Sequence, residues 1–239
     1  MLWYKAWLET RGRFLLLAGG ILLISWFMAP EAIARFLAGS KPVAALAQSG
    51  PVTLSLWFIW TAVAVVLGGA GINTQTFSGV THGPHGSMLF TLSLPVRRRR
   101  LLAVRVTLGA IEGAGLILFI CLFVWSVSPL LRTRVGAASV LLYALMSIFG
   151  SSVFYSLSTF LATFLDEFWQ FNGCFLAAGA MLFLRLPVKK LFSCDLLRLL
   201  VDPTHLAAGA PPWPGILTCL ALSSALLFAA VQIVQRKQY

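Results

Sequence analysis

The feature that most constrains this fold is a series of long runs that contain no Asp, Glu, Lys or Arg. These runs cover residues 14–30, 42–80, 113–131, 135–165, 168–184 and 203–235. A helix needs about 20 mostly apolar residues to cross a bilayer, with a range of about 17–25. Trimmed at proline, glycine and polar clusters, the runs predict six membrane spans, near residues 14–30, 52–71, 106–127, 137–160, 168–185 and 215–234.

The composition also favours a membrane protein. Hydrophobic residues make up 59% of the 239-residue chain and charged residues only 10%, against about 25% charged in average soluble domains. The net charge of +11 comes from basic residues that flank the apolar runs, a pattern typical of membrane proteins rather than of nucleic-acid-binding proteins. We therefore expect a single all-α transmembrane domain over residues 1–239, with membrane lipids and no nucleic acid as partners.

Six spans place both ends of the chain on one side. With the amino terminus in the cytoplasm, ten Lys and Arg residues lie inside and eight outside, and the cluster Arg97, Arg98, Arg99 and Arg100 dominates the short segments near the span ends. The positive-inside bias gives such segments the greatest weight. The sequence thus predicts cytoplasmic termini in a bacterial inner (plasma) membrane, with residues 186–214 as an outer loop.

Residues 1–13 form a short amphipathic segment before the first span. Trp3, Tyr4, Trp7 and Leu8 share one face of a helix, opposite Lys5, Glu9 and Arg13. Such a helix lies in the interface with its aromatic side toward the acyl chains. Two interpretations stay open: a generic aromatic anchor, with Trp3 and Trp7 at the membrane boundary, and an elbow helix that borders a partner's docking surface.

Cysteine and histidine give no metal site. The four cysteines show no Cys-x-x-Cys spacing and three of them lie in apolar runs, which favours small core residues over ligands or disulfides. His82 and His85 form an HxxH pair on a Gly-Pro turn without a third ligand nearby, so polar loop residues are the better interpretation.

Two polar features inside the spans are candidates for function. Glu112 follows Arg105 by seven residues, about two helical turns, and is either an interfacial ion pair or part of a pathway, since carboxylates at bilayer depth are costly. Ser152, Ser156, Thr159 and Thr163 fall on one helical stripe. Such a stripe serves helix packing or a dimer contact, or it lines a polar cavity.

The segment between the second and third spans is more organised than a plain connector. Glycine and proline at residues 79–86 break any long helix, and Ser87 could cap a short one running to Leu94. The stretch MLFTLSLPVRRRRLLAVRV, residues 88–106, resembles the cytoplasmic helix and following basic signature of type-two ATP-binding-cassette (ABC) permeases. The residues that carry the resemblance are Leu92, Leu94, Pro95, Val96, Arg98, Arg99, Leu101 and Leu102. Family members often have an acid and a Gly-Thr pair ahead of the leucines, where this chain reads THGPHGSM.

The resemblance implies that residues 77–100 form a coupling segment that contacts a cytoplasmic ATPase subunit. The contact residues it implies are Gly83, Pro84, His85, Ser87, Met88, Thr91, Leu92, Leu94 and Pro95. It also implies a second permease chain, in a homodimer or a heterodimer, and ATP with Mg in the partner, with no cofactor in this chain. The arginines Arg97, Arg98, Arg99 and Arg100 would anchor the segment to anionic lipid.

Three classes of function follow from these observations. The first is a permease subunit of an exporter, driven by a separate ATPase; the chain has no GxxxxGK[ST] loop to bind ATP itself. The second is an intramembrane enzyme, which requires several His, Asp or Glu side chains at bilayer depth, where the sequence places only Glu112. The third is a non-transporting assembly or signalling protein of the membrane.

Overall fold

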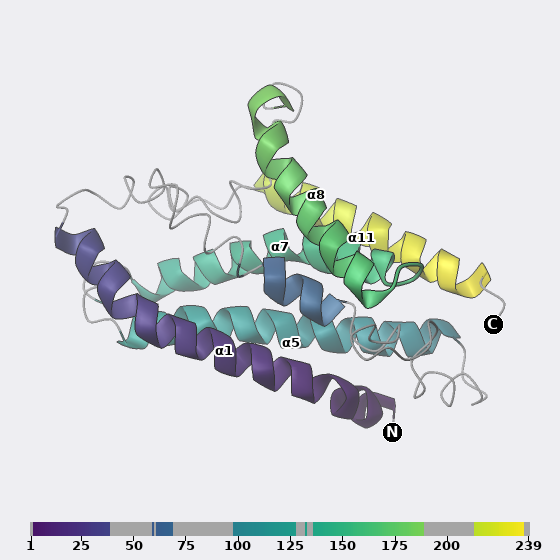
Figure 1. The fold of residues 1–239 in the computed structure, drawn as a ribbon, viewed down its shortest axis with the longest axis horizontal. Helices are drawn as coiled ribbons and strands as arrows, with labels where there is room; N and C mark the ends of the chain where they lie inside the picture. Colours follow the sequence, from purple (N-terminus) through teal and green to yellow (C-terminus); the bar gives the residue numbers. More distant parts are fainter. Residues whose placement is uncertain are drawn as a thin grey trace.

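The computed structural model of the chain describes a helical bundle (Figure 1). It describes residues 2–38, 59, 61–68, 98–127, 132, 136–188 and 213–236. The helices are α1 (Leu2–Ala38), α5 (Arg98–Val127), α7 (Ala137–Leu161), α8 (Glu167–Val188) and α11 (Trp213–Arg236), with a further helical segment at residues 61–68. No strand occurs in the described ranges, so the predicted all-α class is confirmed for them.

Three of the described helices are long and apolar enough to cross a bilayer. They are α7, α11 and, within α5, the stretch Arg99–Val127. At 1.5 Å per residue, the 25 residues of α7 exceed the hydrocarbon thickness of about 30 Å. Large apolar side chains also remain on the outside of the bundle, such as Leu16, Leu176 and Phe228 at 80%, 77% and 66% exposed. These features fit a membrane protein; the six-span count stays a prediction.

The observed helices overlap the predicted spans but differ at their ends. The helix α5 begins at Arg98, eight residues before the predicted start at residue 106. No proline or glycine interrupts residues 98–106, and Arg, Leu and Ala are strong helix formers, so the arginines extend the helix. The predicted outer loop at 186–214 and the predicted span at 52–71 fall mostly outside the described residues.

The predicted elbow helix at residues 1–13 is not a separate element. The chain forms one continuous helix from Leu2 to Ala38. The junction reads Glu-Thr-Arg-Gly-Arg-Phe and contains no proline, and one glycine costs a helix interior only about 1 kcal/mol. Thr10 and Ile21 are both buried, at 5% and 8% exposed, so packing holds the helix on both sides of the predicted break.

The described helices run in two opposite directions. Thr10 of α1 contacts Glu112 of α5, and Ile21 lies in a cluster with Ile120, so α1 and α5 are parallel. Contacts that join Ser152 to Ser223 and Ala162 to Val234 make α7 and α11 parallel to each other. The amino terminus, the start of α5 and the end of α11 therefore lie at one end of the bundle (Figure 1).

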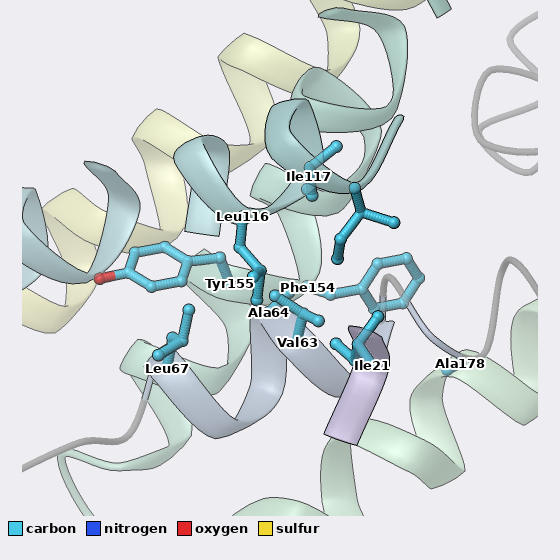
Figure 2. Packing of buried hydrophobic residues seen from close by; sticks show 10 residues of the cluster. Ile21, Val63, Ala64, Leu67, Leu116, Ile117, Phe154, Tyr155 and Ala178 are labelled. Carbon is cyan, nitrogen blue, oxygen red and sulfur yellow. The ribbon is translucent and has the colours of Figure 1, made fainter. Parts of the chain in front are cut away.

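The main core surrounds Phe154 of α7. The buried members of the cluster come from α1, segment 61–68, α5, α7 and α8 (Figure 2), and they are Ile21, Val63, Ala64, Leu67, Leu116, Ile117, Ile120, Phe154, Tyr155 and Ala178. Phe154 itself is fully buried. One side chain of α7 thus lies where five segments of the chain meet.

Candidate functional site

The predicted contacts to an ATPase lie outside the described residues. They are Gly83, Pro84, His85, Ser87, Met88, Thr91, Leu92, Leu94 and Pro95, together with Arg97, and His82 lies outside as well. The described chain resumes at Arg98, where α5 begins. The part of the resemblance that the structure describes is therefore its final portion, the arginines and the two leucines that follow.

The start of α5 is fixed to the ends of two other helices. Arg99 donates through Nη2 to Oε1 of Gln235 in α11, at 2.6 Å. Leu101 and Leu102 are buried, at 6% and 3% exposed, and Leu102 packs against Ala162 and Val234. We call this contact of α5, the end of α7 and the end of α11 the α5 joint. The start of α5 is therefore in contact with the ends of both neighbouring helices.

The predicted membrane anchors lie at the same end of the bundle. Trp3 and Trp7 are 49% and 36% exposed, and Trp169 at the start of α8 is 62% exposed. Arg99 and Arg100 are exposed there too. Exposed aromatic rings beside basic side chains are typical of a membrane–water interface.

The hydroxyl stripe of α7 bonds mainly to other helices and to its own backbone. Ser152 Oγ lies 2.9 Å from Ser223 Oγ of α11, and Thr159 donates to the carbonyl of Gly68 at 3.0 Å. Ser156 donates to the carbonyls of Ser152 and Val153, and Thr163 to that of Phe160. These contacts favour helix packing over a polar pathway.

A buried series of hydrogen bonds beside this stripe was not predicted from the sequence. Gln170 of α8 donates through Nε2 to Ser158 Oγ at 2.7 Å, and Ser158 donates to the carbonyl of Val65 at 2.8 Å. Both side chains are buried, at 3% and 0% exposed. The available signal was a lone Gln in an apolar helix, because such a group needs a partner when water is absent.

A small cavity lies between segment 61–68, α5 and α7. Its volume is about 90 Å³, and it is lined by Val63, Ala64, Gly109, Ala110, Gly113, Ala114, Ile117, Ile148, Ser151, Ser152 and Tyr155. The lining is mostly apolar, with small residues on the α5 side. The lining therefore offers few polar groups to a hydrophilic solute.

Gly109 permits a close approach of three segments. A Cβ at Gly109 would lie 2.7 Å from the Tyr155 hydroxyl and 3.2 Å from the carbonyl oxygen of Leu67. The Tyr155 hydroxyl cannot move freely, because it donates to the Val106 carbonyl at 2.7 Å. Gly109 and Gly113 have the GxxxG spacing that brings membrane helices together, and here Gly109 serves contacts within one chain.

We predict that Gly109→Ala destabilises the fold by about 1–3 kcal/mol, the usual cost of overpacking. Gly113→Ala and Gly115→Ala are the matched controls in the same helix. A Cβ at Gly113 would meet the Leu67 side chain at an ordinary 3.6 Å, and a Cβ at Gly115 would meet nothing within 4 Å. Thermal unfolding in detergent should rank Gly109→Ala clearly below both; equal melting temperatures would contradict the packing described here.

Glu112 is buried in α5, at 6% exposed. Thr10 Oγ1 donates to its Oε1 at 2.7 Å, so the contact made by this carboxyl joins α5 to α1. Arg105, the predicted ion-pair partner, is also buried, at 9% exposed. Among the described residues no group of three His, Cys, Asp or Glu side chains could hold a metal ion.

Comparison with known proteins gives no relative. No protein-family model, no curated protein and no solved structure matches the chain.

Proposed function

We propose that the chain is the membrane-spanning permease subunit of an ABC exporter, which forms a translocation path as a dimer and is driven by a separate ATPase subunit. The proposal starts from the resemblance carried by residues 88–106. The observation that supports it most is the α5 joint. Leu102, the last residue of the resembling motif, is 3% exposed and packs against the ends of α7 and α11.

The α5 joint suits a site where a partner's movement enters the bundle. The proposed coupling segment leads directly into Arg98 in the sequence, and α5 is a continuous helix from that residue. Two packed neighbours then receive the movement through Leu102 and through the Arg99–Gln235 hydrogen bond. A loosely attached helix start would absorb the same displacement without transmitting it.

The arrangement of charges and aromatic rings supports the proposed orientation. Arg99, Arg100 and Arg236 are exposed at one end of the bundle, beside the exposed aromatic residues of α1 and α8. Basic side chains near an anionic leaflet contribute about 1 kcal/mol each and favour the cytoplasmic side. An ATPase would therefore approach the end where α5 starts.

The test is co-purification followed by measurement of ATP hydrolysis. We expect the full chain to bring a separate ATP-binding subunit with it. In the reconstituted complex, the double variant Leu92→Asp with Leu94→Asp should weaken the binding of the ATPase. The rate of ATP hydrolysis should then be the same with and without the permease. Thermal unfolding should stay unchanged.

The matched control is Ser126→Asp, which adds charge at the opposite end of α5. The Ser126 side chain is exposed and donates to the carbonyl of Phe123 in its own helix, so this variant should leave hydrolysis unchanged. An ATPase that binds the double Leu variant as tightly as the parent would contradict the proposal. So would a chain that purifies from its native membrane without any ATP-binding subunit.

A further inference from the structure

A carboxyl group is buried halfway along a membrane-length helix. Glu112 stands 14 residues after the start of α5 at Arg98 and 15 residues before its end at Val127, which is about 21 Å from either end at 1.5 Å per residue. Its side chain is 6% exposed. The neighbouring Ile111 is 63% exposed, as expected of a side chain that faces lipid. Glu112 thus lies inside the bundle, at the level of Thr10 on α1.

The two oxygens of this carboxyl differ. Oε1 accepts a hydrogen bond from Thr10 Oγ1 at 2.7 Å, and Thr10 is itself 5% exposed. Oε2 is buried and has no hydrogen-bond partner among the described residues. One oxygen is therefore held against α1, and the other is buried without a hydrogen bond from the described part of the chain.

The charged and titratable groups around this site are few. On α5 itself, Arg105 lies two turns earlier and is buried. On α1, Arg11 and Arg13 follow Thr10, the first exposed and the second half-buried, and Glu9 precedes it. On α7, the Tyr155 hydroxyl donates to the Val106 carbonyl. The hydrogen bond that holds Glu112 comes from the neutral hydroxyl of Thr10, which supplies no compensating charge.

The cost of burial decides which form of the carboxyl is stable there. A buried neutral hydroxyl that lacks one hydrogen bond carries a modest cost. An ionised carboxylate inside a membrane bundle costs considerably more, because the apolar surroundings do not solvate its charge. One hydrogen bond from Thr10 does not offset that difference, so the ligand that best fits Oε2 is a proton.

We propose that Glu112 is a proton-binding site at the contact of α1 and α5. In this site a carboxylate takes up one proton on Oε2 and becomes a neutral carboxyl, while Oε1 remains the acceptor of the Thr10 hydrogen bond. Release of the same proton leaves one negative charge between two packed helices, which weakens their contact. Protonation of a single side chain thereby controls how tightly α1 packs on α5. The inference does not rest on the proposed transport function.

The first test uses dicyclohexylcarbodiimide, an apolar reagent that forms an adduct with protonated carboxyl groups. The full chain in lipid vesicles is treated over a series of pH values, and the peptide that contains Glu112 is analysed by mass spectrometry. We expect the adduct on Glu112. Above the midpoint of its titration the yield should fall about tenfold per pH unit, as the protonated fraction does.

The chain provides an internal comparison. Asp166, half-buried in the turn between α7 and α8, should react with a water-soluble carbodiimide and an added amine, whereas Glu112 should not. The proposal is overturned if the apolar reagent leaves Glu112 unmodified, or if the water-soluble reagent modifies both residues equally. It is also overturned if sodium or magnesium protects Glu112 at constant pH, because that result identifies a metal cation as the ligand.

A second measurement can be made on the unmodified chain alone. Infrared difference spectra of the unmodified chain between acid and alkaline pH should contain the carbonyl stretch of a protonated carboxyl that is shielded from solvent. Glu112→Gln, a neutral side chain of the same shape, should remove that band and melt at the temperature that the parent shows at acid pH. A spectrum of the unmodified chain without the band would contradict the proposal.

Discussion

Replacing Phe154 with alanine is expected to lower the free energy of unfolding by about 3 kcal/mol, at the low end of the range for Phe→Ala in protein cores. The ring is fully buried in the cluster where five segments meet. Because lipid is as apolar as the core, there is no hydrophobic driving force between membrane helices. The cost therefore comes from the lost contacts and the cavity left behind. Thermal unfolding of the purified chain in detergent measures it.

Phe119→Ala is the matched control for this prediction. Phe119 lies on α5, is 50% exposed and stacks on Phe123 of the same helix, with ring centroids 6.1 Å apart. Its removal opens no internal cavity, so the melting temperature should change little. If both variants lose the same stability, the core around Phe154 does not hold the segments together as described.

The membrane class and much of the helix layout could be predicted from the sequence. Apolar runs without charge predict helices of spanning length, and α7 and α11 agree with residues 137–160 and 215–234 to within two residues. The starts of both helices lie beside helix breakers, Gly136 and Pro212. At α5 no glycine or proline follows Pro95 until Gly109, so the helix includes the arginines that hydropathy had placed in a loop.

The candidate site was less predictable because its groups come from distant parts of the chain. Glu112 was identifiable as a carboxylate in an apolar run, but its contact with Thr10 joins residues 102 positions apart. The predicted break after residue 13 separated Thr10 from the first span, although the structure continues α1 through it. Likewise, the regular spacing of Ser and Thr in the sequence predicted the stripe on α7. It did not predict which groups in other segments would bond to Ser152 and Thr159.

The α5 joint provides the remaining prediction, because it connects the packing of the bundle to the proposed function. Leu102→Ala removes the side chain that packs against Ala162 and Val234. Truncation of a buried leucine costs about 2–5 kcal/mol in protein cores, and the lower end applies where lipid is the solvent. We expect a cost of about 2 kcal/mol, measured by thermal unfolding.

In a complex with its ATPase, the same variant should separate binding from coupling. Leu102→Ala leaves Leu92 and Leu94 in place, so the ATPase should still bind. Movement at the start of α5 would no longer reach α7 and α11 in full, and transport per ATP hydrolysed should fall.

Ala103→Ser, one residue later on the exposed side of α5, is the matched control and should change neither the binding of the ATPase nor the transport per ATP hydrolysed. Leu102→Val, a smaller truncation of about 1 kcal/mol, keeps the comparison possible if the alanine variant does not fold. Full coupling in a variant that has lost the packing of Leu102 would show that force enters the bundle elsewhere.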